Sequence, residues 1–160
     1  MIEPKEVYMH RAIELSQHAG LTENSGGAFG AVIVKDGEII GEGYNQVIKK
    51  NDPTWHAEIE AIRSACNKTG SPHLEGAILY TSSEPCPMCY AAACWAHVQH
   101  IFFAAHVEDA KKYGNFEDID LYREIRKDPK GRLIKSTEFL REPAVEIWKQ
   151  FAAMSNHVHY

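Results

Sequence analysis

The chain has 160 residues, 44% of them hydrophobic, and a formal net charge of −5 from 17 basic and 22 acidic side chains. This length is typical of a single domain with one hydrophobic core, which we expect to cover residues 1–160. No apolar run approaches the roughly 20 residues that a membrane-spanning helix needs. The acidic balance also provides no basic surface to attract nucleic acid, so we expect neither membrane nor nucleic-acid partners.

The amino-terminal segment does not resemble a secretory signal. Charged side chains interrupt its apolar positions at Glu3, Lys5, Glu6, Arg11 and Glu14, whereas a signal peptide needs a continuous apolar stretch. The four cysteines could form two disulfides, but a reducing compartment disfavours them, and the spacing of one pair suits a metal site. We therefore predict a cytoplasmic protein.

Apolar periodicity and turn signals predict alternating helices and strands. A helix is expected over 5–19, between Pro4 and Gly20, and strands over 29–34 and 38–43 flank an Asp-Gly turn. The same signals predict the remaining elements. Helices are expected over 56–67, 86–96, 107–113, 121–127 and 143–154. Strands are expected over 77–80, 100–105 and 133–136. This order predicts an α/β fold in which helices cover both faces of a mixed central sheet.

Two motifs stand at the starts of two predicted helices: His56-Ala57-Glu58 and Pro85-Cys86-Pro87-Met88-Cys89. Residues three apart share a helix face, so Cys86 and Cys89 can bind one ion while His56 supplies a third ligand. Three protein ligands leave one vertex for water, which is typical of catalytic rather than structural zinc. We predict a Zn²⁺ site on these three residues.

Glu58 is predicted to be a proton shuttle rather than a ligand. Residues two apart on a helix point roughly 200° away from each other, so His56 and Glu58 can serve one site only at a transition from loop to helix. A lone CxxC would equally fit a structural knuckle or a redox pair. The combination of HxE with PCxxC is instead typical of nucleobase deaminases, in which the glutamate is the general acid and base.

Longer segments around these motifs resemble the cytidine and deoxycytidylate deaminase superfamily. The resemblance covers residues 26–37 (GGAFGAVIVKDG), 51–58 (NDPTWHAE) and 79–89 (LYTSSEPCPMC), and residues 115–122 (NFEDIDLY) are similar to bacterial guanine deaminases in particular. It implies a three-layer α/β/α cytidine-deaminase-like fold, a Zn²⁺ cofactor and a small purine substrate. The implied reaction is hydrolysis of guanine to xanthine and ammonia.

The same resemblance implies roles for further residues. Asn45 would hydrogen-bond the purine, Ala57 would contact it, Phe29 and Trp95 would form walls of the base pocket, and Asp118 would meet the exocyclic amine or ring edge and assist catalysis. From the residues alone, Asn45 could equally be a turn residue and Trp95 part of the core, while Asp118 lies in an acidic stretch that is typical of a solvated surface.

The resemblance also implies a homodimer that exchanges its carboxyl-terminal helix and tail, residues 143–160, so that Tyr160 covers the neighbouring subunit's site. Three positions depart from the family pattern. Ala28 stands where proline is common, Trp55 replaces a small residue before the metal histidine, and Ser83 stands where cysteine is common. Of these, Trp55 is the change expected to reshape the mouth of the pocket.

Other functions fit parts of the pattern. The chain could deaminate guanosine, cytosine, an aminotriazine or adenosine in transfer RNA, or it could be a non-catalytic zinc-binding module, which would have no need of Glu58. Cys66 and Cys94 are expected to be small buried residues. The spacings of three other histidines do not indicate a second metal site; these are His97, His100 and His106.

Overall fold

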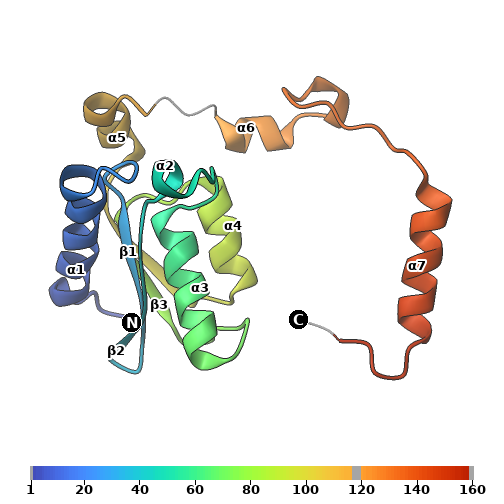
Figure 1. Ribbon diagram of the computed structural model, residues 1–160, viewed down its shortest axis with the longest axis horizontal. Coiled ribbons are helices and arrows are strands. Elements are labelled where there is room, and N and C mark those ends of the chain that lie inside the picture. Colours follow the sequence, from blue (N-terminus) through green and yellow to red (C-terminus); the bar gives the residue numbers. More distant parts are fainter. Residues whose placement is uncertain (1, 117–119, 159–160) are drawn as a thin grey trace. The chain divides into compact units, whose positions relative to one another are not determined.

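A computed structural model describes residues 2–116 and 120–158 (Figure 1). Contacts within the chain divide it into two compact units, residues 1–117 and residues 118–160, which we call the amino-terminal and carboxyl-terminal units. Each is described by itself. No helix in the described ranges is both long enough and apolar enough to cross a membrane.

The amino-terminal unit is built on a four-stranded sheet with the order β2-β1-β3-β4. β1 pairs antiparallel with both β2 and β3, whereas β3 and β4 run parallel. The prediction of a mixed sheet is therefore confirmed. The strand bounds are Gly30–Lys35 for β1, Glu38–Tyr44 for β2, Ile78–Ser83 for β3 and His100–Ala105 for β4.

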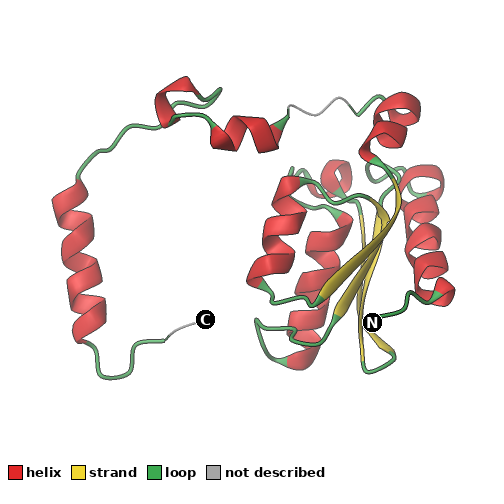
Figure 2. Ribbon diagram, turned by 180° about the vertical axis from the view of Figure 1, so that it is seen from behind, coloured by secondary structure: helices red, strands yellow, loops and turns green. Residues whose placement is uncertain are grey.

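Helices cover both faces of this sheet, which confirms the three-layer α/β/α arrangement (Figures 1 and 2). α1 packs on one face, and α3 and α4 pack together on the other. The helical elements of this unit are α1 (Glu6–Gln17), a π-helical turn η1 (His18–Thr22), α2 (Val47–Lys50), α3 (Ala57–Thr69), α4 (Pro87–Trp95) and α5 (Val107–Gly114).

The central strand β1 supplies both hydrophobic cores. Its side chains alternate between the faces of the sheet: Ala31 and Ile33 pack with α3 and α4, while Val32 and Val34 pack with α1. All four are buried. Because helices cover both faces of the sheet, the central strands β1 and β3 pack against both layers of helices.

Glycines in β2 determine how closely α3 approaches the sheet. A Cβ atom at Gly41 would lie 2.3 Å from the carbonyl oxygen of Ala61, and one at Gly43 would lie 2.2 Å from that of Ala57. Any side chain at these positions would push α3 outward. The two glycines thus set the position of the first turn of α3, where the histidine motif lies.

Some predicted elements differ from the structure. The first helix does not end before Gly20, since η1 continues the turn to Thr22. The strand predicted over 133–136 is wrong, because these residues form bends and irregular backbone with no strand partner among the described residues. The last helix, α7, spans Arg141–Ala153, so it begins two residues and ends one residue earlier than predicted. Pro143 is tolerated in its first turn, where backbone N–H groups have no helical acceptor.

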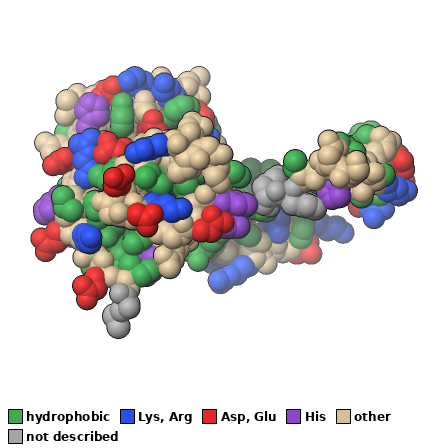
Figure 3. Space-filling view, turned by 90° about the horizontal axis from the view of Figure 1, so that it is seen from below, with side chains coloured by type: hydrophobic (Ala, Val, Ile, Leu, Met, Phe, Trp, Pro, Cys, Tyr) green, Lys and Arg blue, Asp and Glu red, His purple; other side chains and the backbone are tan. Residues whose placement is uncertain are grey.

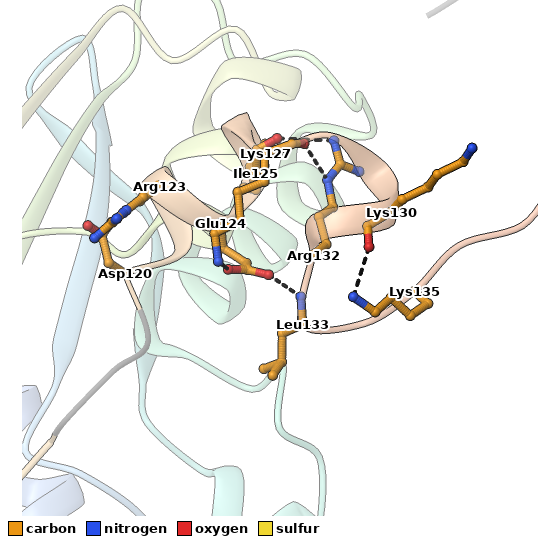
Figure 4. Close-up of polar contacts among 9 residues, drawn as sticks. All are labelled: Asp120, Arg123, Glu124, Ile125, Lys127, Lys130, Arg132, Leu133 and Lys135. Atoms are coloured by element: carbon orange, nitrogen blue, oxygen red, sulfur yellow. Dashed lines mark hydrogen bonds and ion pairs between the residues drawn. The ribbon is translucent and has the colours of Figure 1, made fainter.

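The carboxyl-terminal unit is held by local polar contacts (Figure 4). Asp120 caps the short helix α6 (Leu121–Arg126) by accepting a 2.9 Å hydrogen bond from the backbone of Arg123. The Arg132 side chain donates to the carbonyls of Ile125 and Lys127. A 3₁₀ turn, η2 (Pro129–Gly131), and α7 complete this unit, and none of its described residues is buried.

Candidate active site

The two sequence motifs converge at neighbouring helix starts. His56 is the N-cap of α3 and Cys86 the N-cap of α4, and both have extended backbone. His56 Nδ1 lies 3.6 Å from Cys86 Sγ and 3.5 Å from Cys89 Sγ, and the two sulfurs are 3.5 Å apart. One nitrogen and two sulfurs, separated by 30 residues in the chain, thus form a compact triangle.

The triangle has dimensions that fit zinc. Zinc binds imidazole nitrogen at about 2.0 Å and thiolate sulfur at about 2.3 Å, so ligand atoms at a tetrahedral ion lie about 3.5–3.8 Å apart. The separations of 3.5–3.6 Å match these values. Residues His56, Cys86 and Cys89 can therefore hold the ion, with one vertex left for a non-protein ligand.

Glu58 lies beside the triangle without belonging to it. It is the second residue of α3, only 6% exposed, and its Oε2 is 3.4 Å from Cys89 Sγ. His56 precedes the helix while Glu58 lies within it, which is the loop-to-helix transition that the sequence required. Burial is the main cause that raises the pKa of the Glu58 carboxyl above its usual range, so it can both accept and return a proton.

The two thiols behave as a coupled pair. A hydrogen bond with Cys89, supported by the His56 ring, lowers the pKa of Cys86 to about 4. The same hydrogen bond, together with burial, raises the pKa of Cys89. Cys86, at the amino-terminal end of α4 where the helix dipole stabilises thiolate, therefore loses its proton first, and Cys89 keeps one. A metal ion would displace that proton, so metal affinity should rise with pH.

Supporting contacts hold the loop that carries Asn45. Glu60 accepts a 3.0 Å hydrogen bond from the Tyr44 backbone and a 2.7 Å hydrogen bond from the Gln46 side chain. Ser25 donates from Oγ to the Asn45 carbonyl at 2.7 Å. Sequence reasoning missed these positioning residues because Glu60 looks like an ordinary acidic residue in a first helical turn. Only the tertiary contacts reveal it.

Three residues predicted to contact the substrate lie near the motif or pack with it. Asn45 is 4% exposed and follows β2, and its Oδ1 accepts from the Val47 backbone at 3.2 Å. Phe29 is half-buried against the core that contains Ala57, and its ring meets Phe116 edge to face at 5.2 Å. Ala57 is fully buried at the start of α3, where backbone N–H groups have no helical acceptor.

Trp95, another residue predicted to contact the substrate, is not brought to the triangle. Trp95 ends α4, at the opposite end from the metal cysteines, and is 70% exposed. Asp118 and Tyr160 lie outside the described residues. Cys94 is exposed rather than buried as predicted, because Cys89 and Ala93 occupy the inward face of α4; Cys66 is half-buried.

Trp55, which departs from the family pattern next to His56, has two cationic side chains near its ring. Lys50 Nζ lies 5.1 Å and Arg63 Cζ 5.3 Å from the centre of its ring. Such cation–π contacts orient the indole at the entrance to α3. Its buried Nε1 has no hydrogen-bond partner among the described residues.

Comparison with known proteins agrees with this geometry. Residues 2–105 match the family model described as the cytidine and deoxycytidylate deaminase zinc-binding region. The guanine deaminase of Bacillus subtilis (strain 168) is 46% identical over 152 residues, which cover 92% of this chain and 95% of that protein. A transfer-RNA-specific adenosine deaminase of Aquifex aeolicus (strain VF5) is 34% identical over 122 residues, 76% of this chain and 78% of the relative.

Solved structures extend the comparison to the fold. The X-ray structure of the Bacillus subtilis guanine deaminase has a TM-score of 0.86 at 41% identity and covers 98% of this chain and 100% of its own. A guanine deaminase structure from Nitrosomonas europaea has a TM-score of 0.63 at 25% identity, covering 96% and 87%. With the motif geometry and the family match over residues 2–105, these findings establish that the chain belongs to the zinc-binding cytidine and deoxycytidylate deaminase family.

Proposed function

We propose that this protein is a zinc-dependent aminohydrolase that converts guanine to xanthine and ammonia. The observation that carries the proposal is the triangle of His56, Cys86 and Cys89 with the buried Glu58 carboxylate 3.4 Å from one of its sulfurs. The 46% identity to a guanine deaminase over 92% of the chain supports guanine as the substrate.

The residues of the site divide the chemistry among them. His56, Cys86 and Cys89 would hold zinc, which when bound would supply Lewis-acid activation of water for attack on a ring carbon. Glu58 takes the proton of the attacking water and returns it to the adjacent ring nitrogen. Glu58 or Asp118 then passes the second proton of that water to the departing amine, which leaves as ammonia. The raised pKa of Glu58 suits this shuttle, because a carboxyl that holds its proton more tightly is a better base and can still release the proton.

The purine would be recognised by residues around the start of α3. The backbone N–H of Val47 donates a hydrogen bond to Asn45 Oδ1, so the Nδ2 group of this amide would be the donor to a purine base. The backbone N–H of Ala57 would be a second donor and the Phe29 ring an apolar wall. Tyr160 would cover the site of a neighbouring subunit.

We also propose a cytoplasmic homodimer that exchanges its carboxyl-terminal segments, residues 143–160. In its favour, the described residues of the carboxyl-terminal unit include exposed apolar side chains and none that is buried. Such a segment needs a surface to cover it. The four free cysteines are in keeping with a reducing compartment.

A substrate panel tests the proposed reaction. The zinc-loaded protein is incubated with guanine, guanosine, adenine, cytosine, cytidine and an aminotriazine, and released ammonia is measured. Guanine should give the highest kcat/KM, and xanthine should be the product. Turnover of a nucleoside or a pyrimidine in preference to guanine would contradict the substrate, whereas no turnover of any compound would contradict the activity.

A second candidate is deamination of adenosine in transfer RNA. It is favoured by the 34% identity to a transfer-RNA-specific adenosine deaminase and opposed by the net charge of −5. Phosphate contacts would make RNA affinity fall steeply with salt. Transfer RNA that binds at low salt and is converted to the inosine form would support this candidate, and undetectable binding at low salt would remove it.

A further inference from the structure

A second cluster of metal-binding side chains lies at the other ends of the helices that begin at the active site. His73 and Glu75 belong to the loop between α3 and β3, and His97 follows α4. Figure 1 shows that α3 and α4 end side by side, away from their starts. In Figure 3, seen from that end, histidine side chains lie beside acidic ones on the surface.

The atoms of this cluster are arranged around one carboxylate oxygen. Glu75 Oε1 lies 3.2 Å from His97 Nδ1 and 3.7 Å from His73 Nδ1. The two imidazole rings are stacked, with centroids 4.3 Å apart and planes 17° from parallel. Both rings therefore present Nδ1 to the same oxygen. At an ion bound about 2.0–2.2 Å from each ligand, nitrogen and oxygen would lie about 3.0–3.4 Å apart, so small side-chain adjustments suffice.

Backbone hydrogen bonds fix the two loops to each other. The Leu74 N–H donates to the Ala96 carbonyl at 2.7 Å, and the Gln99 N–H donates to the Ala77 carbonyl at 2.8 Å. Leu74 is fully buried and Ala96 nearly so. Each residue of the cluster is adjacent in sequence to one of these anchored residues. The cluster is therefore preorganised by the fold, although its own side chains reach solvent.

Charge at this position favours a cation. His97 directly follows the C-cap of α4, where the helix dipole places partial negative charge. A backbone hydrogen bond and the His97 ring lower the pKa of Glu75, so its carboxylate is ionised at neutral pH. Imidazole and carboxylate together suit zinc, nickel and copper better than calcium or magnesium.

We propose that His73, Glu75 and His97 form a second metal site, which binds a divalent transition ion such as Zn²⁺ or Ni²⁺ with water completing its coordination. The ion would link the α3–β3 loop to the α4–β4 turn. The thirteen residues of α3 separate this site from the start of the helix by about 20 Å, so the two sites cannot share one ion. The sequence analysis expected no second metal site at His97, because the residues that meet it, His73 and Glu75, come from another loop.

Metal titration of the complete protein tests the proposal. Protein that already holds one zinc per chain is titrated with Ni²⁺ by isothermal calorimetry, and metal content is measured after desalting. We expect one further equivalent to bind. Replacing His73→Gln or His97→Asn should weaken this step by more than about tenfold, while the first zinc is retained. Asparagine is chosen at position 97 because φ there is +55°, which asparagine tolerates.

A matched variant makes the titration decisive. His10→Gln removes an exposed histidine of α1 that lies outside the cluster, and it should leave the second step unchanged. Glu75→Gln, at a 63% exposed side chain, provides a further variant that should fold normally and also lose the step. The proposal is overturned if no second equivalent binds, or if the second equivalent persists in all three cluster variants. Neither result depends on deaminase activity.

Discussion

The two units of this chain differ in what stabilises them. In the amino-terminal unit, the central strands β1 and β3 are buried on both faces of the sheet. In the carboxyl-terminal unit, α7 has a helical pattern as clear as that of α1, yet Ile147 is 64% and Trp148 69% exposed. An isolated helix of thirteen residues is only marginally stable in water. Periodicity thus specifies a helix, whereas the stability of that helix depends on an apolar surface that covers it.

The largest effect is expected from Glu58→Gln, because the proposed chemistry resides in the amino-terminal unit. The amide keeps the shape of the side chain but cannot take a proton from water, so kcat should fall roughly 10²–10⁴-fold. Zinc content, measured by atomic absorption, should stay at one per chain. The control is Glu38→Gln on an exposed position of β2. Undiminished turnover by the Glu58 variant would refute the shuttle.

A pair of glycine variants compares packing in the two units directly. At Gly43 a Cβ atom would lie 2.2 Å from a backbone oxygen of α3, whereas at Gly131 nothing lies within 4 Å. Gly43→Ala should lower the free energy of unfolding by about 1–3 kcal/mol, measured by urea denaturation, and should also weaken zinc binding. Gly131→Ala should leave both unchanged. Equal stability of the two variants would mean that α3 does not rest on β2 as described.

Trp148→Ala tests whether another subunit covers the exposed face of α7. Within one chain this side chain is 69% exposed and meets only the edge of Phe151 among the ring contacts of the described residues. If the carboxyl-terminal segment is exchanged, the variant should weaken the dimer about tenfold or more, as truncated interface tryptophans do. Sedimentation equilibrium measures this. Lys149→Ala, on the same helix, is the control, and a dimer of unaltered strength would argue against exchange.

The smallest expected effect concerns an ion pair that joins α1 to β2. Arg11 donates two 2.8 Å hydrogen bonds to Glu42 and lowers the pKa of that carboxyl. Its stabilisation is therefore present above the ordinary glutamate pKa of 4.5 and is lost as pH falls through the lowered folded-state value. Glu42→Gln should cost less than about 1 kcal/mol at pH 7, because the pair is partly exposed.

That cost should vanish in acid, which thermal unfolding between pH 7 and pH 3 would reveal. The matched control is Glu146→Gln, which removes an exposed ion pair with Lys149 on α7. It should have no comparable pH dependence. A Glu42 variant whose deficit persists in acid would show that packing, rather than charge, accounts for the effect.

Sequence reasoning succeeded where the signal was local. The hairpin at Asp36 and Gly37, the helix starts at His56 and Cys86 and the mixed sheet all follow from short-range spacing, and the structure has them. It failed over 133–136, where β-type residues have no partner strand among those described. A strand needs a neighbour, and no local pattern specifies one.

Contacts between distant loops could not be predicted from spacing. Glu60 meets the backbone of Tyr44 because α3 folds over β2, and His97 meets Glu75 because two loops are joined by backbone hydrogen bonds. In the sequence both sets look like ordinary surface residues. The residues proposed to act chemically could be identified from sequence motifs. The residues that support or surround them could be identified only from the three-dimensional structure.

The separation of 30 residues between His56 and Cys86 bears on how newly made chains mature. An ion held between them closes a loop that contains β3. This strand pairs with β1 on one side and with β4 on the other. Closing a loop of this length in a disordered chain is entropically unfavourable, so we expect zinc to be taken up only after the sheet has assembled. Zinc supply would then limit how many folded chains become active, and not whether the sheet assembles.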